Sequence, residues 1–309
     1  MLRVVPLLLF LTLLGCGPRS ASPSADGRLR VIATTSLVAD LARNVGGDDV
    51  SVEALMGPGV DPHLYRATEG DVARMAGADL ILYNGLHLEG KMVDLLERLG
   101  DRARAVADAV PAEQRLAPPE FLGNPDPHVW MDVALWKLAA TATVDALSTR
   151  DPAHADAYRA RGDAYVARLD SVDAAVRARL HEVPEASRVL VTAHDAFNYF
   201  GRAYGYTVRG LQGISTATEA GTGDVQDLAA FVSERRVPAL FVESSISPRS
   251  IEAVRAAVRS RGQEVSLGGS LYSDALGGTG SGAETYEAMV VHNADTIARA
   301  LAPTPSAAR

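Results

Sequence analysis

The sequence contains a single cysteine, Cys16, and this scarcity excludes two ways of building a scaffold or a site. A lone cysteine cannot form a disulfide within the chain, so the protein is not a disulfide-stabilised scaffold. Metal sites built from several thiolates, such as four-cysteine zinc sites, are excluded as well. A metal in this protein must therefore be held by imidazole nitrogen and by oxygen atoms.

Basic side chains are also few, which argues against nucleic acid as a partner. Lysine occurs only at positions 91 and 137, and the formal net charge is −8 at pH 7. A nucleic-acid-binding protein normally presents a clustered basic face, so we expect no such partner. With 47% hydrophobic and 22% charged residues, the 309-residue chain has an ordinary globular composition. It is long enough for two domains with cores of their own.

The sequence has no apolar run of the length that a membrane-spanning helix needs, about 20 residues. A shorter run at residues 4–14 follows Arg3 and precedes small residues, which is typical of an export signal over residues 1–15. It ends in Leu-Leu-Gly-Cys, which is similar to a bacterial lipobox. We therefore predict a lipidated Cys16, a flexible tether at 16–27, and an exported protein anchored in the membrane at the periplasm or cell envelope. The alternative is a plain signal peptide with an incidental cysteine.

Short apolar segments alternate with helical ones along the rest of the chain. Strands are predicted at 29–35, 50–56, 79–84, 188–192, 207–211, 239–243 and 264–267. Helices are predicted at 37–45, 68–76, 92–99, 196–204, 224–235, 248–261 and 284–301. Alternation of this kind is the signature of mainly parallel sheets with helices on both faces.

A long helical segment, residues 152–183, separates the two halves. Tyr158, Tyr165 and Leu169 keep a helical period in it. One helix of roughly 28 residues would be about 40 Å long, so it either bridges two lobes or breaks near Gly162; we favour the bridge. We therefore predict an α/β protein with two (β/α) lobes, each with a mainly parallel sheet, joined by one long backbone helix. The predicted limits are 28–151 and 184–303 for the lobes, 152–183 for the linking helix and 304–309 for a disordered tail.

Four segments place a side chain suited to metal binding just after a strand-like run. They are DPH at 61–63, DPH at 126–128, TAHD at 192–195 and YSD at 272–274. Imidazole nitrogen and carboxylate oxygen suit a borderline transition metal, and three His with one Asp would fill a four-coordinate site. Because the segments lie far apart in the sequence, this pattern favours a metal held in the cleft between the lobes.

Several further side chains near these segments have more than one possible role. Asp61, Asp126 and Asp195 could each accept an N–H from a ligand ring, fixing its tautomer, or could simply cap a turn. Glu243 ends an apolar strand and could orient a ligand. His87 could flank the site or lie on the surface. The remaining histidines fall on predicted helices: His154, His181 and His292.

Taken together, these motifs make the chain resemble a known family. They are VDPHLYRATEGDVARMAGADLILYNGLHLE at 60–89, PDPHVWMDV at 125–133, VTAHDAFNYFGRAYGYTVRGLQGISTATEA at 191–220, LFVESSISPRSIEAV at 240–254 and LYSDALG at 271–277. The chain resembles the solute-binding lipoproteins of bacterial zinc and manganese ABC importers, above all the TroA-like branch. The resemblance extends from about residue 28 to residue 303.

The resemblance implies which residues hold the metal. The metal ligands of this family fall on His63, His128, His194 and Asp274, between two α/β lobes joined by one long helix. Some relatives have Glu in place of His194, and that change is associated with manganese. Zinc importers of the family often carry a loop rich in His and acidic residues in the first lobe. The matching segment here, 102–124, contains no His, so this metal-collecting feature is absent.

These observations predict a binding protein that captures a divalent metal outside the cytoplasm and delivers it to an ABC permease in the cytoplasmic membrane. Zn²⁺ is the first expected ligand and Mn²⁺ the second, and we expect a monomer without enzyme activity. An exported metallohydrolase is one alternative, although the sequence has no HExxH motif. Another is a binder of a metal chelate such as a siderophore, which would bind the metal only together with the chelate.

Overall fold

The computed structural model describes residues 27–121 and 123–302. The predicted export signal, the lipidated Cys16, the tail at 304–309 and all of the tether except residue 27 lie outside the described residues. In the part of the chain that is described, no helix combines the length and the apolar character needed to cross a membrane.

The first lobe is built on a four-stranded parallel sheet with the strand order β2-β1-β3-β4. Three of its strands were predicted from the sequence, and β4 was not, because three residues are too few to show a pattern. The strands are β1 (Leu29–Ala33), β2 (Val50–Ala54), β3 (Leu80–Tyr83) and β4 (Ala103–Ala105).

Three of the four helices of the first lobe begin at side-chain caps. Thr68 and Asp71 form a capping box at the start of α2. The cap of α1 is Thr35, whose side chain accepts a hydrogen bond from the N–H of Val38. The helices are α1 (Ser36–Gly46), α2 (Glu69–Gly77), α3 (Val93–Arg98) and α4 (Val133–Arg150), and α4 was not predicted.

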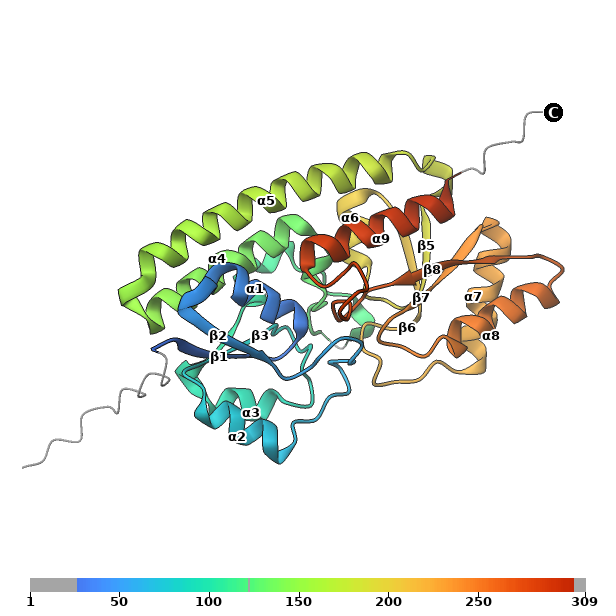
Figure 1. Cartoon of the computed structure of the whole chain (residues 1–309). Coiled ribbons are helices and arrows are strands. Elements are labelled where there is room, and N and C mark those ends of the chain that lie inside the picture. Colours follow the sequence, from blue (N-terminus) through green and yellow to red (C-terminus); the bar gives the residue numbers. More distant parts are fainter. Residues whose placement is uncertain (1–26, 122, 303–309) are drawn as a thin grey trace, which may run out of the picture.

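The long helix α5 (Ala155–His181) is continuous over 27 residues. Gly162 does not break it. A Cβ at Gly162 would lie 2.3 Å from a methyl of Val144, so glycine here allows α5 to approach α4 closely. Figure 1 shows α5 running along the molecule across both lobes, beside α4 and α9. This is the predicted bridge, although the helix is shorter than the predicted 152–183.

The second lobe contains two parallel strand pairs, β5-β6 and β7-β8, and β5 lies beside β7. The strand β8 extends beyond the predicted limits of 264–267. The prediction was too short because the glycines of this segment interrupt the alternating pattern that indicates a strand. A Cβ at Gly268 would lie 2.6 Å from the Phe241 ring, so this strand needs glycine there to pair closely. The strands are β5 (Val189–His194), β6 (Thr207–Gln212), β7 (Ala239–Glu243) and β8 (Ser266–Leu271). The helices are α6 (Asn198–Tyr204), α7 (Thr222–Arg235), α8 (Arg249–Ser260) and α9 (Tyr286–Leu301).

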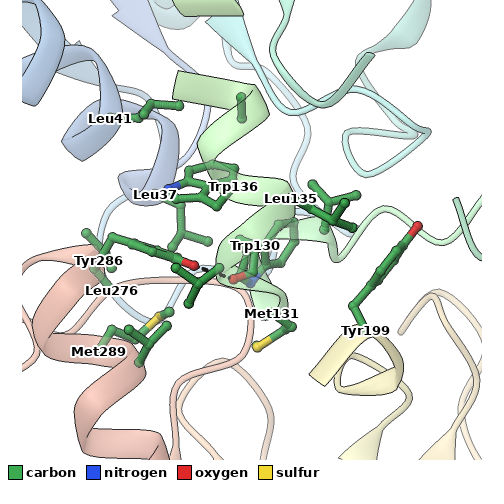
Figure 2. Close-up of a cluster of buried hydrophobic side chains, with 14 of the residues drawn as sticks. Leu37, Leu41, Trp130, Met131, Leu135, Trp136, Tyr199, Leu276, Tyr286 and Met289 are labelled. Atoms are coloured by element: carbon green, nitrogen blue, oxygen red, sulfur yellow. Dashed lines mark hydrogen bonds between the residues drawn. The ribbon is translucent and has the colours of Figure 1, made fainter. Parts of the chain in front are cut away.

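One hydrophobic core extends through both lobes. Leu37 of α1, Trp136 of α4 and Tyr286 of α9 belong to it and are almost completely buried. Figure 2 shows these side chains packed together, with the Tyr286 hydroxyl directed at the backbone of Trp130. Because protein interiors resist deformation, this shared core restricts how far the lobes can move relative to each other.

Candidate metal centre

The four predicted ligand residues come together between the lobes. His63, His128, His194 and Asp274 are buried, and each offers one ligand atom within 4.8 Å of the others. The His63 and His128 Nε2 atoms are 3.3 Å apart. Asp274 Oδ1 lies 3.5 Å from His128 Nε2, and Asp274 Oδ2 lies 3.4 Å from His194 Nε2. In a tetrahedral site with metal–ligand distances of about 2.1 Å, ligand atoms lie about 3.4 Å apart.

The fold brings three of these side chains together at the carboxyl ends of parallel strands, whereas His128 does not directly follow a strand, contrary to the prediction from the sequence. His63 lies in the loop between β2 and α2, and His128 directly precedes a short 3₁₀ turn, Val129–Met131, that leads into α4. His194 is the last residue of β5, and Asp274 follows the end of β8. In α/β proteins this end of the strands is the usual position of a binding site.

The His128 ring is oriented by a buried carboxylate of its own segment. Asp126 Oδ1 lies 2.7 Å from His128 Nδ1 and also accepts the backbone N–H of His128 at 3.0 Å. This contact directs Nε2 toward the other candidate ligands. Asp126 is itself held by the second lobe, because Asn198 Nδ2 donates to Asp126 Oδ2 at 3.2 Å. Burial disfavours the charged ring, but Asp126 and Asp274 outweigh it and raise the pKa of His128.

The His194 ring has an equivalent partner from a neighbouring strand. Glu243, the last residue of β7, places Oε2 2.6 Å from His194 Nδ1, and its Oε1 accepts the backbone N–H of His194 at 2.9 Å. Glu243 therefore has the orienting contact that the sequence suggested. Burial again opposes the charged ring, but Glu243 and Asp274 together raise the pKa of His194 well above its usual value.

Asp61 and Asp195 differ from Asp126, and they bond backbone groups instead of a ligand ring. Asp61 Oδ1 accepts the backbone N–H of His63 at 2.9 Å, and Asp195 Oδ1 accepts that of Gly210 at 2.6 Å. The Asp61 contact is a local turn cap, whereas the Asp195 contact links the end of β5 to the neighbouring strand β6. His63 thus has no carboxylate on Nδ1 in the described part of the chain, and mainly through burial its pKa is lowered to about 3.

Two buried polar atoms of the cluster lack a hydrogen-bond partner among the described residues. They are His194 Nε2 and Asp274 Oδ1, and both face the centre of the group. Leaving such atoms unpaired costs about 1–3 kcal/mol each, and a cation bound between the four side chains would satisfy both. Burial favours the neutral form of Asp274, but His194 and His128 outweigh burial and hold the pKa of this carboxyl group well below its usual value. The carboxylate is therefore charged.

Sequence reasoning missed two residues that support the site. The fully buried Glu89 accepts hydrogen bonds from Thr34 Oγ1 at 2.7 Å and from the backbone N–H of Asn84 at 2.8 Å. The Asn84 side chain in turn donates to the carbonyl of Pro127 at 3.1 Å, next to His128. A lone Glu after a strand carries no periodic signal, so the sequence pattern could not reveal this contact.

The second missed residue is Trp130, which connects the two lobes beside the cluster. Its ring packs edge-on against His128, with ring centroids 5.1 Å apart. Its Nε1 donates to the carbonyl of Ser273 at 2.7 Å and so fixes the residue before Asp274. The other histidines lie outside the cluster: His87, His154 and His181 are exposed and His292 is partly exposed.

Comparison with known proteins shows similarity over almost the whole chain. The family described as zinc-uptake complex component A, periplasmic, matches residues 31–300. Over 291 residues the chain is 48% identical to the manganese-binding lipoprotein MntA of Bacillus subtilis, covering 94% of this chain and 95% of the relative. It is 29% identical over 304 residues to the metal ABC transporter substrate-binding lipoprotein SsaB of Streptococcus sanguinis, covering 96% of each.

A third relative is known both as a sequence and as a structure. The chain is 50% identical over 285 residues to the zinc-binding protein TroA of Treponema pallidum, covering 92% of each. The solved structure of this periplasmic zinc-binding protein superimposes with a TM-score of 0.87, covering 90% of this chain and 100% of that one. The two-lobed α/β architecture predicted from the sequence is therefore also that of a solved relative.

Proposed function

Because this chain belongs to the family of periplasmic component A proteins of zinc-uptake complexes, we propose that it captures a bare divalent metal ion and delivers it to an ABC importer. The family match confirms the resemblance inferred from the motifs. The observation that carries the proposal is the buried group of three imidazoles and one carboxylate, whose candidate ligand atoms all lie within 4.8 Å of one another. The metal ligands that we propose are His63, His128, His194 and Asp274.

A carrier fits this site better than a metallohydrolase. A catalytic zinc site keeps one coordination position open for water, whereas here four protein side chains are available for a four-coordinate ion. The four side chains are also almost completely buried. The relatives named above are described as binding proteins. We therefore propose a transport protein without enzyme activity.

The choice between zinc and manganese follows from the ligand set. The named relatives include both a manganese-binding and a zinc-binding protein at similar identity. Three imidazoles favour Zn²⁺, since the affinity of a given site for divalent ions rises from manganese toward copper and zinc. Zn²⁺ is thus the first ligand that we propose and Mn²⁺ the second.

We further propose where the protein works. Related proteins are described as lipoproteins, and the segment before Cys16 has the features of an export signal. A lipid on Cys16 would hold the protein at the outer face of the cytoplasmic membrane, near an ABC permease. We propose that it acts there as a monomer.

Elemental analysis of the purified protein, with competitive chelator titration, tests the proposed function. We expect one tightly held divalent ion per chain, and a free-ion affinity that does not depend on any organic chelate. Protein that takes up no bare Zn²⁺ or Mn²⁺ would overturn the proposal. Uptake of metal only together with a chelate would favour the siderophore-type alternative.

Replacing Glu243 with glutamine is expected to weaken zinc binding by about 10- to 100-fold. The amide keeps the size of the side chain but removes the charge that increases the basicity of the His194 ring, and loss of such a partner typically has this effect. Chelator competition measures the affinity. The control is Glu264→Gln, a highly exposed carboxylate paired with Arg259 in the same lobe. Equal affinity in the two variants would show that Glu243 does not act on the site.

Bound metal is expected to stabilise the folded protein. The four proposed ligands come from distant parts of the chain and meet only in the folded state, so the ion binds that state selectively. At a free metal concentration 100 times the Kd, the free energy of unfolding should rise by about 2.7 kcal/mol. For a chain of this size, the melting temperature should rise by roughly 4–5 °C. Thermal unfolding with zinc and with excess chelator measures the effect, and identical curves would contradict the assigned ligands.

A further inference from the structure

An ion can reach the metal cluster only if part of the protein moves. His63 is 3% exposed and Asp274 is 1% exposed, while His128 and His194 are completely buried. A protein that takes up and releases an ion through such a site needs a segment that opens at low free-energy cost. The surroundings of the cluster show which segment this is.

On the side of the shared core, the cluster is closed by large side chains and by several hydrogen bonds between the lobes. Trp130 and Tyr286 are fully buried there. Trp130 Nε1 donates to the carbonyl of Ser273 at 2.7 Å, and the Tyr286 hydroxyl donates to that of Trp130 at 2.8 Å. The Tyr199 hydroxyl donates to the carbonyl of Asp126 at 2.9 Å. Separating the lobes on this side would expose aromatic side chains to water and would break these hydrogen bonds at the same time. Both changes have a large free-energy cost.

On the side of His63, a loop of the second lobe, residues 213–221 between β6 and α7, contacts the first lobe. Thr216 Oγ1 donates to Asp61 Oδ2 at 2.6 Å, across 155 positions of sequence. The other oxygen of the same carboxylate, Oδ1, accepts the backbone N–H of His63. Within the described residues, this is the one hydrogen bond from the loop to the first lobe. It therefore connects the loop directly to the segment of a candidate ligand.

The loop has both the freedom and the space to move. It contains no helix or strand. A bond from Gln212 Nε2 to the carbonyl of Thr218, at 3.1 Å, lies within the second lobe and does not hold the loop to the first. The loop also lines a cavity of about 450 Å³, and the first lobe contributes His87 and Phe121 to its wall. The loop can move into this space without disturbing the shared core.

We propose that the Asp61–Thr216 hydrogen bond, here called the latch, sets how fast a metal ion enters and leaves the cluster; this inference rests on the proposed function. The latch holds the loop closed but contributes no ligand atom. Its loss should increase the open fraction of the free and of the loaded protein alike. Association and dissociation should then both accelerate, while the affinity stays nearly constant. Loss of a metal ligand would have a different effect, because it would lower the equilibrium affinity for the ion.

Stopped-flow kinetics of Thr216→Val in the full chain test the latch. Valine keeps the shape of threonine and removes the hydroxyl donor. Zn²⁺ association is followed by the fluorescence of Trp130, whose ring packs on His128, and release is followed with a chromogenic chelator. A hydrogen bond to a carboxylate is one of the stronger kind, so we expect both rate constants to rise by about tenfold or more. The equilibrium Kd should stay within about threefold of the original.

Two further variants show whether the hydroxyl is the cause. Thr216→Ser keeps a donor and should restore the slow rates, and Thr218→Val, an exposed position in the same loop, should leave them unchanged. Normal zinc binding with unchanged rates in Thr216→Val would overturn the latch alone. A weaker affinity at an unchanged association rate would also overturn it, since the bond would then position His63. Absence of zinc binding in the original protein would overturn the proposed function and the latch with it.

Discussion

Replacing His194 with alanine is expected to weaken zinc binding by at least about 100-fold. Four-ligand zinc sites bind with apparent free energies of about 10–16 kcal/mol, so one ligand of four accounts for roughly 3 kcal/mol, which is about 100-fold. The loss at this position should exceed that average. His194 is completely buried, and its removal leaves the buried carboxylate of Glu243 without the ring that it contacts at 2.6 Å.

Competitive titration with a chelator of known affinity measures this effect. The matched control is His181→Ala, an exposed histidine at the end of α5, which should bind zinc as tightly as the original protein. Thermal unfolding of both variants without metal separates a lost ligand from a general loss of stability. An affinity of His194→Ala within threefold of the control would remove His194 from the proposed ligand set.

Acidification is expected to weaken metal binding steeply between pH 7.5 and pH 5. An imidazole must be neutral to bind a metal, so protons compete with the ion. With an ordinary ring pKa near 6.5, this competition would become appreciable only below about pH 7. Nearby carboxylates outweigh burial and raise the pKa of His128 and, more strongly, of His194. Competition should therefore begin at higher pH than ordinary histidines predict.

The size of this effect depends on how many rings must lose a proton. His63, with a pKa lowered to about 3 mainly by burial, is neutral across this range and does not contribute. One proton displaced per ion weakens binding tenfold per pH unit, and two displaced protons weaken it about 100-fold. Titrations in metal buffers at several pH values measure the slope. A constant affinity from pH 7.5 to pH 5 would contradict ligation by His128 and His194.

Three of the four ligand positions could be predicted from the strands, because His63 follows β2, His194 ends β5 and Asp274 follows β8, and parallel strands end at the same edge of a sheet. His128 lies well beyond the end of β4, so its Asp-Pro-His segment, and not a preceding strand, is what indicated it.

The sequence could not show which of the nearby carboxylates orients a ligand ring. Asp61 and Asp126 stand in identical Asp-Pro-His segments, yet only Asp126 contacts the ring of its own histidine. Asp61 instead reaches Thr216 in the other lobe. That difference comes from tertiary packing and leaves no trace in the local sequence.

Tertiary packing also explains why α4 was not predicted and why β8 was predicted with the wrong limits. The helix α4 packs against α1 and α5, so it has buried residues on several faces and lacks the apolar stripe of a surface helix. The strand β8 contains Gly268 and Gly269, which make room for neighbouring side chains but weaken the strand pattern. Burial from several directions and close backbone approach are properties of the folded chain, and single-sequence periodicity does not record them.

The core shared by the lobes also bears on how the chain acquires its structure. Trp136 and Tyr286 are 150 positions apart, and their rings pack with centroids 5.4 Å apart. Neither half of the chain can complete this part of the interior alone, because each would leave large aromatic surfaces in water. We therefore expect the two lobes to unfold together, and we expect neither half to be stable when it is produced alone.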